Sequence, residues 1–168
     1  MVKNLHLRKF YLLILFIVAV FSCSKTNEIS LSEEKNKILA LHNLQRDYHF
    51  NKDSVSFAAQ FSDNFISVNK GQITRPSIEE TLARYNRYFS SVDFVKWDDL
   101  SDPIIKFSDD YSMAYAIVDK IVSITYKDAN GAIQTGETHF GWTTIYRKYD
   151  NEWKIDAVTS TEVPSDSN

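Results

Sequence analysis

Residues 143–155 read TTIYRKYDNEWKI and carry more information on the architecture than any other part of the chain. After Asp150-Asn151, Trp153 and Ile155 alternate with the polar residues Glu152 and Lys154, as in a strand that buries one face. Asn tolerates the positive φ that a two-residue hairpin turn requires. The segment therefore predicts an antiparallel hairpin in which Tyr146 lies opposite Ile155.

The segments before this hairpin show two periods. Helical spacing of apolar residues predicts helices, and two-residue spacing predicts strands. In the first helix the apolar stripe is Ile38, Leu41, Leu44 or Gln45, and Tyr48. Asp-Ala-Asn-Gly at 128–131 joins two long strands, because Asn-Gly is a strong hairpin signal. The predicted helices are 31–48, 54–61 and 76–89, and the predicted strands are 65–68, 94–97, 104–107, 112–127, 133–149 and 153–161.

The order of these elements resembles that of one known family. Residues 143–155 resemble the closing hairpin of SnoaL-like members of the nuclear transport factor 2-like superfamily, in which a basic pair, an Asp-Gly turn and a Trp-x-Ile start recur. Here the pair is Arg147-Lys148, and Asn151 replaces the Gly. The resemblance covers residues 33–163 and implies an α+β fold. In that fold a cone-shaped, curved antiparallel sheet of about five to six strands wraps around three N-terminal helices.

The first 23 residues predict export. Three basic residues precede residues 10–21, which are twelve consecutive apolar residues. Twelve are too few to span a membrane but suit the core of a signal peptide. Ser22-Cys23 follows directly and resembles the cleavage and lipidation site of bacterial lipoproteins; the alternative is an uncleaved anchor. The resemblance implies a bacterial cell-envelope protein, anchored to the bilayer through acylated Cys23 on the periplasmic or outer-membrane face.

The domain boundaries follow from these two pieces. We expect a lipoprotein signal peptide at 1–22, a lipidated tether at 23–32, the folded domain at 33–163 and a disordered tail at 164–168.

Composition excludes several classes of protein. The chain has 168 residues, and loss of residues 1–22 would change its formal net charge from −3 to −6, which disfavours nucleic acid as a partner. A single cysteine rules out an internal disulfide and a multi-cysteine metal site. The sequence contains no P-loop, G-x-S-x-G or Rossmann glycine pattern. We therefore expect no cofactor and no bound metal.

The loop at 128–131 determines which side chains of the long strands share a face. A two-residue turn at Asn130-Gly131 and a four-residue loop at 128–131 both remain open. Both have an even number of residues, so both place Asp119 on the face that carries the aromatic residues of the next strand. We expect that face to line a cavity. The predicted ligand-binding residues are Tyr85, Trp97, Tyr115, Phe140, Trp142 and Tyr146.

Asp119 is the candidate catalytic residue. A carboxyl group that burial makes less acidic can act as a general base, and a nearby Tyr hydroxyl can stabilise an oxyanion. This division of labour is similar to that of ketosteroid isomerase. The alternative is a carboxylate paired with a Tyr hydroxyl or an Arg, or one at the sheet rim.

Two functions remain open, because the family includes cyclases, isomerases, dehydratases and non-enzymatic binding or assembly domains. The first is a membrane-tethered domain whose cavity holds a small apolar ligand. The second is a SnoaL-like isomerase, cyclase or dehydratase that uses Asp119 as general base with a pocket Tyr. The opposite sheet face, with Lys120, Glu137 and His139, would suit a homodimer, which the family often forms. The sequence mildly favours the binding domain.

Overall fold

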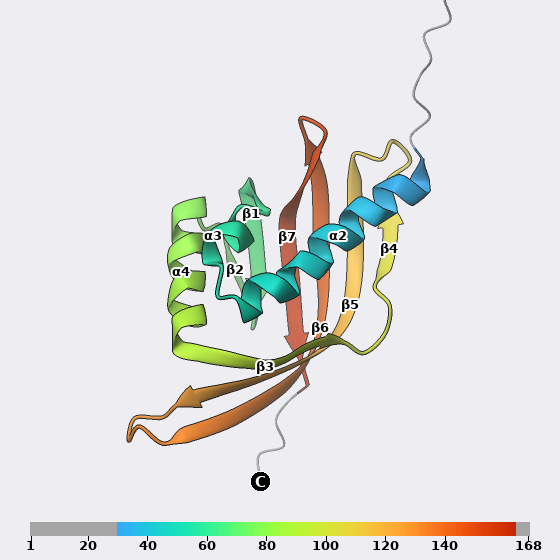
Figure 1. Cartoon of the computed structure of the whole chain (residues 1–168). Helices are drawn as coiled ribbons and strands as arrows, with labels where there is room; N and C mark the ends of the chain where they lie inside the picture. Colours follow the sequence, from blue (N-terminus) through green and yellow to red (C-terminus); the bar gives the residue numbers. More distant parts are fainter. Residues whose placement is uncertain (1–29, 164–168) are drawn as a thin grey trace, which may run out of the picture. The chain divides into compact units, whose positions relative to one another are not determined.

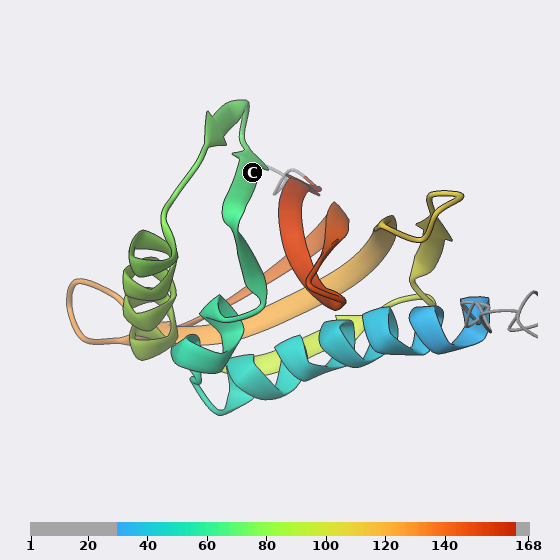
Figure 2. The same cartoon turned by 90° about the horizontal axis from the view of Figure 1, so that it is seen from above.

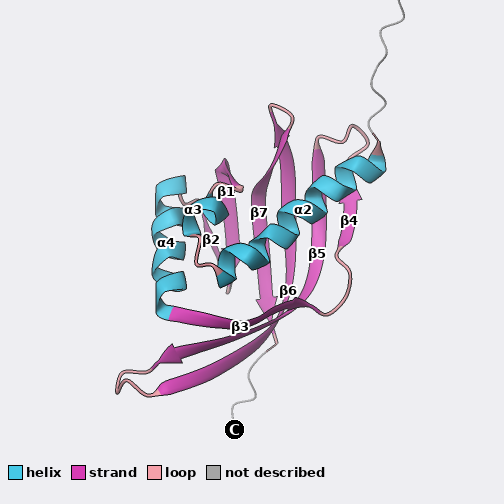
Figure 3. Cartoon of the chain, in the orientation of Figure 1, coloured by secondary structure: helices cyan, strands magenta, loops and turns pink. Residues whose placement is uncertain are grey.

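The computed structural model describes residues 30–163, so the predictions for the signal peptide, Cys23 and the tail lie outside the described residues. The described residues form three helices and one seven-stranded sheet (Figures 1 and 3). In chain order, the elements are α2 (Leu31–Phe50), α3 (Ser54–Ala58), β1 (Phe61–Asn69), β2 (Gln72–Thr74), α4 (Ile78–Ser91), β3 (Val92–Asp99), β4 (Ile104–Phe107), β5 (Met113–Lys127), β6 (Ile133–Tyr149) and β7 (Glu152–Glu162).

The sheet is mixed. Its strand order is β2-β1-β7-β6-β5-β3, and β4 pairs with β5 in addition. β1 runs parallel to β7, whereas the other pairs are antiparallel. The α+β class is confirmed, but the expectation of five to six antiparallel strands was wrong. β2 was not predicted because it has only three residues, all exposed, and so shows no alternation of buried and exposed positions. The parallel pairing was not predicted because β1 and β7 are far apart in the sequence.

α4 begins close to the predicted position because of a local capping box. Ser77 Oγ accepts a hydrogen bond from the Glu80 backbone N–H at 3.1 Å, and Glu80 Oε2 accepts one from the Ser77 backbone N–H at 2.8 Å. Both acidic residues of the first turn also face the positive end of the helix dipole.

α2 turns its predicted stripe to the protein interior, with Gln45 and not Leu44 at the position that the sequence left open: Ile38 and Gln45 are buried, and Leu41 and Tyr48 pack against the core. Leu44 is 40% exposed. The buried positions are Glu34, Ile38, His42, Gln45 and His49, which recur along one side of the helix. Four of these five residues are polar, and their burial is tolerated because hydrogen-bond and ring partners meet them there. Figure 2 shows α2 lying across the strands on one side of the sheet.

β5 and β6 pair one residue out of the predicted register. Lys127 lies opposite Ile133, so the loop has five residues, 128–132. The Asp128 carboxylate holds this loop by accepting the backbone N–H groups of Asn130 and Ala132, each at 2.9 Å. An odd-length loop exchanges the two faces of one strand relative to its partner. The predicted face was therefore right for β6 and wrong for β5.

The hairpin of β6 and β7 has the predicted register near its turn, with Tyr146 opposite Ile155. Ile145 then pairs with Ala157, which leaves Asp156 as an extra residue in a bulge. Beyond the bulge, Val158 and Ser160 share the side of the sheet that faces the helices.

The hydrophobic core lies between that side of the sheet and the helices. Ile38, Phe89, Tyr146 and Ile155 are among its least exposed members, at no more than 1% each. The opposite side of β5 is apolar but exposed, with Tyr115 at 42% and Ile117 at 44%. Among residues 30–163, no helix combines the length and apolar character needed to cross a membrane.

Candidate functional site

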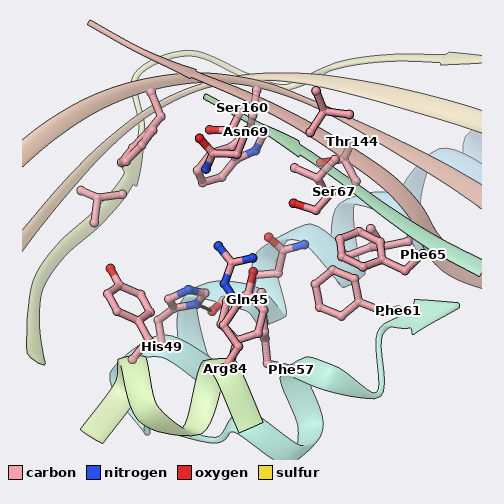
Figure 4. A pocket seen from close by; sticks show the side chains of 18 of the residues that line it. Gln45, His49, Phe57, Phe61, Phe65, Ser67, Asn69, Arg84, Thr144 and Ser160 are labelled. Atoms are coloured by element: carbon pink, nitrogen blue, oxygen red, sulfur yellow. Dashed lines mark hydrogen bonds between the residues drawn. The ribbon is translucent and has the colours of Figure 1, made fainter. Parts of the chain in front are cut away.

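A pocket of about 330 Å³ lies between the helices and the sheet (Figure 4). This volume is at the lower end of the range for small-molecule sites. The three helices and five strands of the sheet contribute to it. Its lining residues are Gln45, His49, Phe57, Phe61, Phe65, Ser67, Val68, Asn69, Arg84, Tyr85, Tyr88, Trp97, Val122, Phe140, Trp142, Thr144, Ile155, Val158 and Ser160.

Aromatic rings form most of the pocket wall, and they pack against one another. Phe57 makes an edge contact with Tyr85 at 4.5 Å between ring centroids, and Phe61 makes one with Phe65 at 4.4 Å. Trp97 lies 5.7 Å from Trp142. Edge-to-face and tilted pairs of this kind add to the stabilisation that comes from burying the rings, and they hold the shape of the wall.

His49 gives the pocket a neutral polar group. Its ring stacks on Trp97 with 3.5 Å between centroids. Burial lowers the pKa of His49 to about 3, so the ring is uncharged near neutral pH. Nδ1 lies 2.6 Å from the Gln45 carbonyl oxygen. Because a carbonyl can only accept, Nδ1 carries the proton and Nε2 is left as the acceptor nitrogen.

Arg84 is the only charged side chain among the described residues that line the pocket. Figure 4 shows its side chain extending from α4 into the pocket. Within residues 30–163, Arg84 has no ion-pair partner, and its guanidinium carbon lies 5.9 Å from the centre of the Tyr85 ring. This distance is near the outer limit of a cation–π contact.

A buried ionic cluster lies behind the tryptophans of the wall. The Lys120 ammonium lies 2.5 Å from Asp99 Oδ1, and His42 Nε2–H donates to Asp99 Oδ2 at 2.7 Å. Burial lowers the pKa of Lys120 below its ordinary value. Burial alone would raise the pKa of Asp99, but hydrogen bonds from His42 and Lys120 outweigh it and lower that pKa. Lys120 also lies 5.4 Å from the ring centre of Trp97.

The structure places four of the predicted ligand-binding residues in the pocket wall: Tyr85, Trp97, Phe140 and Trp142. Tyr146 faces the same side of the sheet but is fully buried and does not line the pocket, and burial raises the pKa of its hydroxyl. Tyr115 lies on the opposite side of the sheet.

Asp119 also lies on that opposite side, about half exposed, and pairs with His139 of β6. The expectation that it faces the cavity was wrong because the loop 128–132 has an odd number of residues. Lys120 takes the inward position instead. The hypothesis of an isomerase-type enzyme thereby loses its predicted base, since no described residue that lines the pocket is a carboxylate.

Sequence reasoning missed His49, Gln45 and Arg84 as pocket residues. The spacing of His42 and His49, seven residues apart on one helical face, was the available signal for the first of them. In the sequence Arg84 stands four residues after Glu80, which predicts an i,i+4 pair on the helix surface and not a pocket residue. Among residues 30–163, no group of three or more His, Cys, Asp or Glu side chains is placed to hold a metal ion.

Comparisons with known proteins address the fold. No family model and no curated protein matches the sequence. Solved structures do match. A nuclear transport factor 2-like (NTF2-like) protein from Cytophaga hutchinsonii is 18% identical, with 77% of this chain and 98% of that chain covered, at a TM-score of 0.62. An NTF2-like superfamily protein from Salmonella enterica is also 18% identical, with 82% and 96% covered, at a TM-score of 0.66.

This chain has the NTF2-like fold. A ketosteroid isomerase-like protein from Erwinia carotovora shares the NTF2-like fold at 15% identity and a TM-score of 0.59, with 79% of this chain and 98% of that chain covered. At such identities the likeness shows the fold alone, so the function must be argued from the pocket.

Proposed function

We propose that this NTF2-like chain is a lipid-anchored domain that binds a small, largely apolar molecule in a cone-shaped cavity between its sheet and helices. The observation that carries the proposal is the pocket itself. It is walled by aromatic rings, contains a neutral imidazole and hydroxyl groups, and lacks a carboxylate among its described lining residues. Such a lining favours binding of an apolar body over acid–base chemistry.

The pocket can be tested with N-phenyl-1-naphthylamine, a neutral dye whose emission rises in apolar surroundings. Val158 lies on the pocket side of β7, and replacement by Trp would fill the space that the dye needs. We expect Val158→Trp to weaken dye binding by at least about 30-fold, a loss of about 2 kcal/mol. Fluorescence titration measures the effect.

Ile133→Trp is the matched control, because it adds the same indole at a position that is 74% exposed at the start of β6. It should bind the dye as the wild type does. Thermal unfolding of both variants separates loss of the pocket from loss of the fold. Equal dye binding by Val158→Trp and the wild type would place the dye elsewhere and count against the proposal.

The lipid anchor rests on residues 1–23, which precede the described residues. Cys23→Ser removes the thiol that would carry the lipid, and we expect the variant to lose acylation and to enter the soluble fraction. Metabolic labelling with a fatty acid and fractionation of cells check this. An acylated Cys23→Ser protein that remains with membranes would contradict the tether.

The homodimer also stays a proposal. The exposed side of β5, with Tyr115 and Ile117, offers the apolar surface for it, and Asp119 with His139 lies on the same side. Light scattering on the chain from residue 24 onward distinguishes a dimer from a monomer.

A further inference from the structure

The pocket combines an apolar wall with one cationic group. Guanidinium groups present planar donors that match the two oxygens of a carboxylate, and a pair with such an anion is stronger than a hydrogen bond between neutral groups. Arg84 has no acidic partner among residues 30–163, whereas nine other lysine and arginine side chains of that part of the chain form ion pairs. Its fork of donors is therefore available to a bound molecule.

The surroundings of Arg84 do not oppose an anion. The described lining residues include no carboxylate. Burial raises the pKa of the Tyr85 and Tyr88 hydroxyls, so both remain uncharged near neutral pH. Ser67, Asn69 and Ser160 line the same pocket with neutral groups that can donate hydrogen bonds.

From this arrangement we infer that the ligand is an organic carboxylate with an aromatic or alicyclic body, whose head pairs with Arg84 while the body lies against the aromatic wall. The inference rests on the proposed function and specifies the class of molecule that the pocket takes. The protein as a whole has a formal net charge of −3, so general attraction of anions does not account for such a preference.

Isothermal titration with 2-naphthoate and 2-naphthamide tests the inference, because the two probes have the same ring system and differ in charge at the head. The wild type should bind naphthoate at least about 10-fold more tightly than naphthamide. Arg84→Met keeps most of the apolar length of the side chain and removes the charge. It should bind the two probes with equal affinity.

Arg87→Met is the matched control, because Arg87 is exposed on the same helix, as Arg84 is, but does not line the pocket. It should retain the preference for naphthoate. If Arg84→Met and Arg87→Met lower the preference equally, general electrostatics account for it and the role of Arg84 is overturned. If the wild type binds the dye but shows no preference for naphthoate, the carboxylate is overturned while the pocket function stands. If neither the dye nor the naphthalene probes bind, the proposed function fails as well.

Discussion

Glu34→Ala should lower the free energy of unfolding by about 3–5 kcal/mol, the range for breaking a buried charge pair. Glu34 is 5% exposed. Its carboxylate accepts hydrogen bonds from Trp153 Nε1 at 2.6 Å, Lys148 Nζ at 2.9 Å and Lys37 Nζ at 2.8 Å. Alanine would leave a buried indole N–H and a nearly buried ammonium without this partner. Denaturant unfolding measures the loss.

Glu33→Ala is the matched control for this prediction. Glu33 is the exposed neighbour on the same helical turn, and its removal should change the free energy of unfolding by less than about 0.5 kcal/mol. A similar small loss for Glu34→Ala would mean that the contact between α2 and the sheet contributes little to stability.

The same contact predicts a pH dependence. Burial would raise the pKa of Glu34, but the hydrogen bonds from Lys37, Lys148 and Trp153 outweigh it and lower that pKa from 4.5 to about 2. A carboxyl group whose pKa is lowered by folding stabilises the fold at every pH above its pKa in the unfolded chain. This stabilisation is lost as the pH falls from about 5 to about 2. The loss attributable to Glu34 is at most about 3 kcal/mol. Glu34→Gln should lack this part of the acid profile.

Lys120→Met should be the other strongly destabilising change, by about 3 kcal/mol. Lys120 is 3% exposed, and its ammonium faces the Asp99 carboxylate. Methionine fills the volume but leaves that carboxylate with His42 as its remaining hydrogen-bond partner. Denaturant unfolding gives the size of the loss, and the emission of Trp97 and Trp142 reports whether the pocket wall moves with it.

The double variant Lys120→Met with Asp99→Asn shows whether the cost comes from an unpaired charge. Asn removes the negative charge, so the double variant should be more stable than Lys120→Met alone. If the losses of unfolding free energy were strictly additive, the two side chains would contribute independently. The 2.5 Å contact between them leads us to expect non-additive losses.

Elements defined by their own sequence could be predicted. β4 and β6 have the predicted bounds, because turn residues directly before and after each segment mark where the strand begins and ends. α4 follows its capping box, which involves residues only three positions apart. The aromatic face of β6 was predicted for the same reason, and it supplied Phe140 and Trp142 to the pocket.

Features that depend on distant segments could not be predicted. The length of the loop before β6 determines which side chains of β5 face the helices. Because the loop includes residue 132 in addition to 128–131, Lys120 faces the helices in place of Asp119. The pairing of β1 with β7 joins residues that are about ninety positions apart, which no local pattern indicates. The candidate base was placed on the wrong side by this one parity error.

The pocket was only partly predictable for a related reason. The strand part of its aromatic wall follows from composition and strand period, whereas the missed polar residues Gln45, His49 and Arg84 come from α2 and α4. Gln45 lies in the predicted stripe as the alternative to Leu44, whereas His49 lies outside that stripe. Their burial depends on partners in other strands, such as Trp97, and those partners are known only once the chain is folded.

The buried side of α2 has a further consequence for how uniquely this chain assembles. A helix with a uniform apolar stripe can slide along a sheet by one turn at small cost, because one aliphatic contact replaces another. Here positions about two turns apart present a carboxylate to Trp153, an imidazole to Asp99 and a second imidazole to the face of Trp97. A slip by one turn would bury each group without its partner, so the docked position is unique. A ligand would then meet His49 and Gln45 at fixed positions, set by contacts up to about four helical turns away.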